Sequence, residues 1–442
     1  MEQNINQALL AFIDRSPTAW HAVENLRARL DGAGFRELSE GERWAVAQGG
    51  RYYVRRNGSS LIAFRVPREE PLGFMLMAAH VDSPSFQIKS LDSVVSAGAY
   101  TQLNVEPYGG MLMATWLDRP LSAAGRVVLR RGDTIGTQLV NIDRDLLLIP
   151  NLAIHMDRKA NEEKRYDAKT DMLPLLGLVQ DGKSFRTLVA EEAGVDEGAI
   201  LSADLRLYPR TPGTVWGMDG AFVSAPRLDD LQCVYACLEG FLAAEESPSA
   251  AVFCAFDNEE VGSRTRQGAD SRFLEDTLLR LCESLGLGSG DYRRLLAESM
   301  MVSADNAHAV HPNHPEYADR ADRPVLNGGV VLKFNAAQRY TSDAVSAAVF
   351  AEICRRAGVP VQRYSNRADL PGGSTLGHIS LTHVSVCSVD TGLAQLAMHS
   401  CYETAGARDT VYMIRAAREF YSSALRSGAG GYTIAEQRRP GE

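Results

Sequence analysis

The hydrophobic positions along the chain fall into two kinds of pattern. Short unbroken apolar runs that end at polar residues are typical of strands buried on both faces. Between them lie longer segments whose apolar positions recur at helical spacing, which predicts amphipathic helices. The expected strands are 74–79, 251–256 and 300–303, and the expected helices lie within 5–30, 230–244 and 271–285. This alternation predicts an α/β fold with a mostly parallel sheet flanked by helices.

The middle part of the chain has a different texture. From about residue 90 to residue 220 the segments are short and alternating, Gly and Pro are frequent, and a charged stretch covers 157–169. Such a pattern is typical of a β-rich module with an exposed loop. We therefore expect an α/β domain formed by 1–90 and 223–442, with a β-rich domain inserted over 91–222.

The composition narrows the range of partners. The 442 residues carry a formal net charge of −9, and no block of Lys or Arg offers the basic surface that nucleic acids require. No apolar run approaches the roughly 18 residues that cross a bilayer, and the polar start lacks the features of a signal peptide. We therefore expect a cytoplasmic protein without nucleic-acid or membrane partners. The seven cysteines form no CxxC pair, which speaks against a disulfide framework.

The most informative junction follows the apolar run 251–256, where the sequence continues Asp257-Asn258-Glu259-Glu260. In open α/β sheets, ligands bind beyond the carboxyl ends of the strands, so these side chains lie where chemistry is expected. Two neighbouring carboxylates in a half-buried site repel each other, and one of them loses its charge unless a cation compensates it. A metal ion is the simplest such cation.

Four further segments place imidazole or carboxylate groups at the end of a predicted element. Each has a plainer interpretation when taken alone: His80 as a histidine packed in the core, Asp229 as a helix N-cap, and Asp305 as a turn residue. The combination is more informative, because histidines mixed with carboxylates are the ligands expected for zinc-like ions rather than for magnesium or calcium. The segments are His80-Val81-Asp82, Leu228-Asp229-Asp230, Ser303-Ala304-Asp305-Asn306 and Met398-His399-Ser400.

Taken together, these segments resemble the aspartyl aminopeptidases, a family of di-metal exopeptidases. Five blocks occur in the family's order between residues 79 and 400. The resemblance implies a catalytic α/β domain split in sequence, an inserted β-rich domain used for dimerisation, and a tetrahedral dodecamer that encloses the active sites. The blocks are Ala79-His80-Val81-Asp82-Ser83-Pro84, Arg227-Leu228-Asp229-Asp230, Asp257-Asn258-Glu259-Glu260-Val261-Gly262-Ser263, Ser303-Ala304-Asp305-Asn306-Ala307-His308 and Ala397-Met398-His399-Ser400.

The resemblance also implies the roles of individual residues. Zinc is the expected metal, at two ions per chain, with cobalt or manganese as substitutes because the same ligands suit all three. Glu259 then remains free to act as general base and acid on bound water. Asp82 is expected to orient the imidazole of its neighbour in the His-x-Asp segment. The implied ligands are His80 and Asp305 for one ion, Glu260 and His399 for the other, and Asp229 as the bridge between them.

Selectivity for an N-terminal Asp or Glu requires single basic groups, because a chain of net charge −9 does not attract acidic peptides as a whole. Lys333 resembles the family's residue for an acidic side chain, although its pattern fits a surface lysine on an edge strand almost as well. His155 resembles a family histidine that contacts substrate in a neighbouring subunit. A metal-binding role, or that of an ordinary loop histidine, is the alternative. The predicted activity is release of N-terminal Asp or Glu from peptides.

Three other functions fit parts of the pattern. A related di-metal exopeptidase of neutral specificity would keep the metal ligands without the acidic pocket. A glycosidase would use Glu259 and Glu260 as its acid and base, but neighbouring residues on a strand point to opposite faces and flank one bond poorly. A non-catalytic scaffold stabilised by metal would also retain the ligands, although the intact Glu259 favours catalysis.

Overall fold

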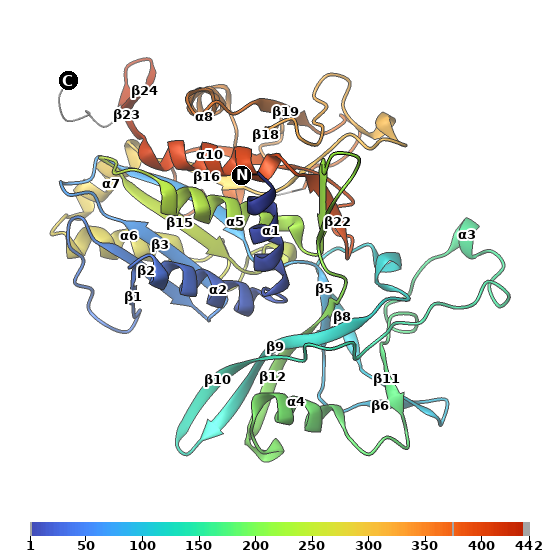
Figure 1. Ribbon diagram of the computed structural model, residues 1–442. Coiled ribbons are helices and arrows are strands. Elements are labelled where there is room, and N and C mark those ends of the chain that lie inside the picture. Colours follow the sequence, from blue (N-terminus) through green and yellow to red (C-terminus); the bar gives the residue numbers. More distant parts are fainter. Residues whose placement is uncertain (1, 374, 436–442) are drawn as a thin grey trace.

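The computed structural model describes residues 2–373 and 375–435 and has a nine-stranded sheet at its centre (Figure 1). Five of the eight neighbouring strand pairs are parallel, which confirms the predicted mostly parallel sheet. In spatial order the strands are β1 (Arg36–Leu38), β2 (Arg51–Arg56), β3 (Ser60–Arg65), β15 (Ala250–Phe256), β4 (Phe74–His80), β16 (Met300–Ala304), β20 (Cys387–Gly392), β18 (Val330–Phe334) and β19 (Val361–Ser365).

Helices cover both faces of this sheet. One hydrophobic cluster joins one face to α1, α2, α5, α8 and α10, and a second joins the other face to α6, α7 and α9. Every residue of β4 and β15 is buried for this reason, which explains their unbroken apolar runs. The helices are α1 (Glu2–Asp14), α2 (Ala19–Gly32), α5 (Leu228–Ala243), α6 (Phe273–Ser284), α7 (Ser289–Ala297), α8 (Ala344–Arg356), α9 (Leu376–Ser380) and α10 (Asp409–Ser422).

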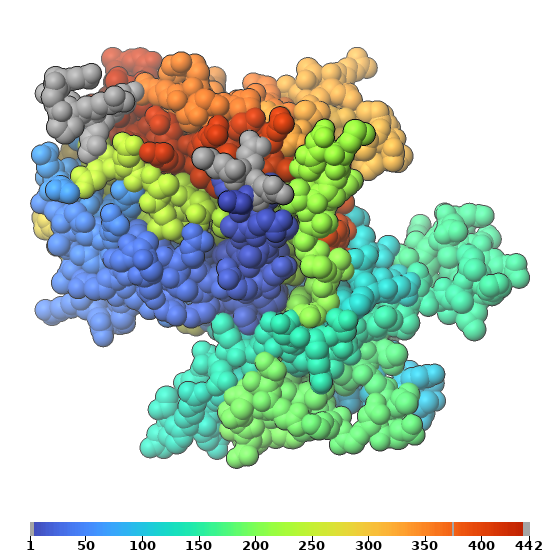
Figure 2. All heavy atoms as spheres, viewed as in Figure 1, coloured from blue at the N-terminus to red at the C-terminus, as the bar shows by residue number. Residues whose placement is uncertain are grey.

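The segment between β4 and α5 forms a β-rich lobe on one side of the sheet, drawn in cyan to green in Figures 1 and 2. It has its own hydrophobic cluster. Only four residues separate the end of β4 from the first strand of the lobe, β5. The domain limits at 91 and 222 stay a prediction. One sheet has the order β10 (Thr134–Asn141), β9 (Leu121–Arg131), β12 (Ile200–Pro209), β5 (Ser85–Ile88) and β8 (Val105–Tyr108); another has β11 (Leu175–Leu178), β7 (Tyr100–Gln102) and β6 (Val94–Ser96); the helices are α3 (Ala160–Glu163) and α4 (Phe185–Ala193).

A further five-stranded sheet joins the end of this lobe to the C-terminal third of the chain. Its loop between β21 and β22 carries one of the predicted ligands. Within residues 2–373 and 375–435, no helix has the length and apolar character needed to cross a membrane. The strands are β13 (Thr214–Trp216), β14 (Phe222–Ala225), β22 (Glu403–Gly406), β21 (Ala394–Leu396) and β17 (Ala307–His308), and a separate hairpin follows as β23 (Ala424–Gly428) and β24 (Gly431–Ala435).

Candidate metal centre and active site

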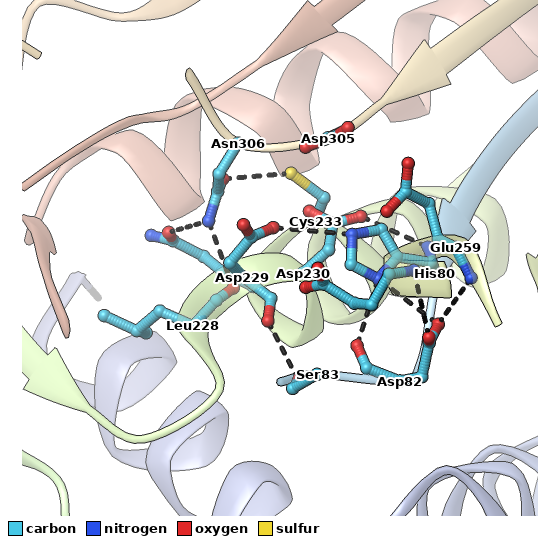
Figure 3. Close-up of polar contacts among 12 residues, drawn as sticks. His80, Asp82, Ser83, Leu228, Asp229, Asp230, Cys233, Glu259, Asp305 and Asn306 are labelled. Atoms are coloured by element: carbon cyan, nitrogen blue, oxygen red, sulfur yellow. Dashed lines mark hydrogen bonds and ion pairs between the residues drawn. The ribbon is translucent and has the colours of Figure 1, made fainter. Parts of the chain in front are cut away.

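The predicted ligands come together at the carboxyl ends of three neighbouring strands. His80 is the last residue of β4, Asp305 follows β16, and a 3-10 helix, η3 (Glu259–Val261), follows β15. Because β15, β4 and β16 are adjacent and parallel, their ends meet at one edge of the sheet. Asp229 in the first turn of α5 and His399 between β21 and β22 complete the group. Figure 3 shows the Asp229 carboxylate directed toward the imidazole of His80.

Asp229 lies between the two histidines and presents one carboxylate oxygen to each. Its Oδ1 is 3.4 Å from Nε2 of His80, and its Oδ2 is 3.5 Å from Nε2 of His399. Nε2 of His399 is also 3.4 Å from Oε2 of Glu260. A carboxylate that faces two separate ligand groups in this way suits a residue shared by two cations.

The donor set fits metal ions on chemical grounds. Ligand atoms of His80, Asp229 and Glu260 lie within 4.8 Å of one another, and so do those of Asp229, Asp230 and Asp305. Three buried carboxylate oxygens have no hydrogen-bond partner within the part of the chain that the structure describes: Oδ1 of Asp229, Oδ1 of Asp230 and Oε1 of Glu260. Unpaired buried carboxylates are costly, and a divalent cation would compensate them. The mixture of imidazole and carboxylate favours zinc over calcium or magnesium.

The crowding of acids also changes their protonation. Burial raises the pKa of Glu259 to about 8; His80 opposes the rise and Asp305 adds to it. Burial likewise raises the pKa of Asp305 and lifts that of Glu260 well above its ordinary value. Burial alone would lower the pKa of His80, but its contacts with nearby carboxylates outweigh burial and raise it. Without a cation the site therefore holds protons, and metal binding would displace them.

Asp82 holds the turn that carries the two glutamates. Its Oδ1 accepts the backbone N–H of Glu259 at 3.1 Å, and its Oδ2 accepts that of Glu260 at 3.2 Å. Nδ1 of His80 lies 3.0 Å from the backbone oxygen of Asp82 and 3.6 Å from its Oδ1. A proton on Nδ1 would be donated to that backbone oxygen, which leaves the Nε2 lone pair facing the ligand cluster.

Glu403 has a parallel role on the other side of the cluster. It is buried, and its Oε2 accepts the backbone N–H of Asp229 at 2.9 Å while its Oε1 accepts that of His399 at 2.7 Å. One carboxylate therefore fixes the backbone of two predicted ligands from different parts of the sequence. The sequence offered one weak signal for this residue, an acid four positions after His399.

A cavity opens beside the cluster and contains the predicted selectivity residue. Lys333 lies on β18 between β19 and β20, so it is on an internal strand and not on an edge. Its side chain is 3% exposed, and its Nζ lies 3.5 Å from Oδ1 of Asp305. The pKa of Lys333 is raised well above its ordinary value because Asp305 and other acids outweigh its burial. The lining includes His80, Asp229, Glu259, Asp305, His308, Lys333, Tyr340, Tyr364, Met398 and His399.

His155 does not join this group. It is exposed in a turn five residues before α3, within a loop that Figure 1 shows extending away from the rest of the molecule. It does not line the cavity beside Lys333. Within its own chain, His155 is therefore not among the residues that line the candidate active site.

One local expectation was wrong, and one plainer alternative, Asp229 as a helix N-cap, is also excluded. The Glu259-Glu260 pair does not continue the strand, because Asn258 adopts a left-handed conformation (φ 64°) and the chain enters η3. The strand-face argument against a glycosidase therefore does not apply to this pair. Asp229 is not the N-cap of α5, since the helix begins at Leu228 and Asp229 itself has non-helical φ and ψ values.

Sequence reasoning also gave no role to Asp230 and His308. Oδ2 of Asp230 accepts the backbone N–H of His80 at 3.2 Å, and burial raises the pKa of Asp230 well above its ordinary value. His308 lines the cavity with its side chain open to solvent, and partial desolvation there, with the nearby charge of Lys333, lowers its pKa, which keeps its imidazole neutral. Both residues are close in sequence to predicted ligands, and this proximity was the one feature of the sequence that could have indicated a role for them.

The fold and the site define a class: an α/β protein with a histidine–carboxylate cluster suited to metal ions at the carboxyl edge of its sheet. Comparison with known proteins gives the family. The family model described as "Aminopeptidase I zinc metalloprotease (M18)" matches residues 12–421. A "Probable M18 family aminopeptidase 2" from Clostridium novyi is 45% identical over 423 residues, covering 94% of this chain and 98% of that protein.

Solved structures agree with this assignment. The structure titled "Cryo-EM structure of the Ape4 and Nbr1 complex" superposes with a TM-score of 0.92 at 35% identity, covering 95% of this chain and 86% of that one. The mApe1 dodecamer of S. cerevisiae gives a TM-score of 0.83 at 29% identity, covering 94% and 96%. The chain belongs to the M18 family, which includes the aspartyl aminopeptidases, so the predicted resemblance is confirmed. Its activity is that of a zinc-dependent aminopeptidase.

Proposed function

We propose that this chain releases N-terminal Asp or Glu from peptides with the help of two zinc ions and Glu259 as general base and acid. One ion is assigned to His80 and Asp305, and the other to Glu260 and His399, with Asp229 shared. The observation that carries the proposal is the position of Asp229, whose two oxygens face the two histidines at 3.4 and 3.5 Å.

Glu259 is suited to proton transfer. It lines the cavity beside the ligand cluster, and burial raises its pKa above that of an ordinary glutamate, which makes its carboxylate a stronger base. Zinc, when bound, supplies a coordinated water of lowered pKa and polarises the peptide carbonyl. The Glu259 carboxylate takes the proton of the attacking water and returns it to the leaving amine. Asp82 holds the backbone of the same turn, which keeps this carboxylate directed at the cavity.

Lys333 is proposed to bind the acidic side chain of the substrate. Its ammonium group lies in the cavity, buried and paired with Asp305. When a cation binds the carboxylate of Asp305, the positive charge of Lys333 becomes available to a substrate carboxylate in a desolvated environment. This exchange explains how a chain of net charge −9 can select an anionic residue.

Assembly is proposed to complete the active site. A structural relative is titled a dodecamer, and the exposed loop of His155 extends away from its own active site. We propose that the chain forms a tetrahedral dodecamer through the β-rich lobe and that His155 contacts substrate in a neighbouring subunit. The cytoplasmic location and the lack of nucleic-acid partners stay predictions.

A panel of substrates tests the proposal. Purified zinc-loaded protein should cleave Asp- and Glu-peptides faster than Leu-peptides, and it should not cleave an N-acetylated Asp-peptide. A chelator should abolish activity and added zinc should restore it. Faster cleavage of Leu-peptides would indicate a neutral exopeptidase, and inactivity with zinc, cobalt and manganese would indicate a scaffold.

A further inference from the structure

Tyr108, at the end of β8 in the β-rich lobe, contacts the turn that carries the catalytic glutamate. Its phenol hydroxyl donates to Oδ2 of Asp82 at 2.7 Å and accepts from Nδ2 of Asn258 at 2.8 Å. Asp82 in turn accepts the backbone N–H groups of Glu259 and Glu260. One hydroxyl group therefore contacts both side chains that determine where this turn lies.

Asn258 is the second of these side chains. It directly precedes η3 in a left-handed conformation, which Asn tolerates better than most residues. Its Oδ1 accepts hydrogen bonds from Oγ1 of Thr265 at 2.8 Å and from Nε2 of Gln267 at 2.7 Å. With these acceptor contacts made, the amide nitrogen points to Tyr108, so the hydroxyl group completes the set of contacts around the turn.

The ring of Tyr108 is itself held by the lobe. The guanidinium carbon of Arg206, on β12 of the same sheet, lies 3.4 Å from the ring centroid, a close cation–π contact. Burial and the nearby charge of Asp82 raise the pKa of Tyr108 well above its ordinary value, so its hydroxyl stays protonated and remains a donor. The ring is thus held by the lobe, whereas its hydroxyl contacts two residues that closely follow strands of the ligand-bearing sheet.

We propose that Tyr108 is a positioning residue that sets the orientation of the Glu259 turn through Asp82 and Asn258. The inference rests on the proposed role of Glu259 as general base. The predicted ligands lie outside the β-rich lobe. Through Tyr108, however, the position of the lobe relative to the sheet controls turnover. Small displacements of a catalytic group are costly, since about 1 Å can reduce a rate by about 100-fold.

The variant Tyr108→Phe tests this, because it removes only the hydroxyl group and keeps the ring over Arg206. We expect kcat for an Asp-peptide to fall by about 10- to 100-fold, while KM, zinc content and assembled mass stay within twofold. Amide hydrogen exchange in 257–263 should become faster. Tyr208→Phe is the matched control, since that hydroxyl lies in the same lobe and donates to Oδ1 of Asn141 at 2.7 Å. It should leave kcat and this exchange unchanged.

An unchanged kcat in Tyr108→Phe would overturn the proposal, and so would a loss of zinc or assembly in proportion to the loss of kcat. Asn258→Asp provides a second variant, which removes the amide donor while keeping an acceptor oxygen. In the double variant, kcat should fall by less than the product of the two fold-losses measured for the single variants. A fall equal to that product would show that the two residues act separately. Hydrogen exchange requires no turnover, so it tests the positioning even if an active Glu259→Gln variant shows that Glu259 is not the base.

Discussion

Replacing Lys333 with methionine tests whether one buried cation sets substrate selectivity. The lysine side chain is 3% exposed, and its Nζ lies 3.5 Å from a carboxylate oxygen of Asp305. At that distance an ion pair is worth about 5 kcal/mol at an effective dielectric constant of about 20, before desolvation. Truncating one partner of a buried charge pair costs about 2–5 kcal/mol. Since about 1.4 kcal/mol is tenfold, kcat/KM for an Asp-peptide should fall by roughly 30- to 4,000-fold.

The assay compares kcat/KM for Asp-, Glu- and Leu-peptides together with zinc content. Burial raises the pKa of Asp305 and Lys333 lowers it, so the variant also perturbs a predicted ligand. The Leu-peptide reports that effect, and the ratio of Asp to Leu isolates selectivity. Lys89→Met is the control, because this half-exposed lysine lies 3.9 Å from Glu106 in the β-rich lobe and its loss changes the net charge equally.

An equal fall in kcat/KM for Asp- and Leu-peptides would refute the reasoning. It would mean that Lys333 supports Asp305 but does not bind the substrate carboxylate. A fall in kcat/KM for the Asp-peptide in the Lys89→Met control would show that the net charge of the chain affects selectivity more than the pocket does.

Three further predictions follow from single contacts. Glu403→Gln should weaken zinc binding and lower the free energy of unfolding, measured in urea, by about 1–3 kcal/mol. The reason is that the single oxygen of an amide cannot replace the two oxygens that accept the two backbone N–H groups. Unchanged zinc affinity would contradict this. Gly392→Ala should reduce zinc content, since its Cβ would lie 1.8 Å from the backbone oxygen of Asp305, whereas Gly290→Ala, with no atom within 4 Å, should not. His155→Ala should keep its zinc and assembly but lose activity, and mixed oligomers with Glu259→Gln should regain some; lost zinc would instead make His155 a ligand.

The strand ends of the fold were predictable because a buried strand leaves a clear local pattern. The apolar run of β15 is fully buried by helices on both faces, and the polar residues after it lie at the edge where the predicted ligands meet. The ends of β4 and β16 could be located in the same way. The residues brought together at this edge therefore could be named before the structure was known.

Unlike Asp82, two other residues that support the predicted site, Glu403 and Tyr108, could not be predicted, because their contacts cross long stretches of sequence. Glu403 accepts the N–H of a residue 174 positions away, and its place four positions after His399 is only a weak local signal. Tyr108 lies in the β-rich lobe, 150 positions before Asn258. The location of Lys333 also stayed open, because its burial depends on which strands flank β18 in the assembled sheet.

The most direct test of the central claim compares Glu259→Gln with Glu260→Gln, measuring zinc per chain by elemental analysis and kcat on the same samples. We expect Glu259→Gln to retain two zinc ions per chain while kcat falls by about 10²- to 10⁴-fold, and Glu260→Gln to lose zinc. Full activity in Glu259→Gln, or loss of zinc from Glu259→Gln with zinc retained in Glu260→Gln, would contradict the assignment of one glutamate to the proton and the other to the metal.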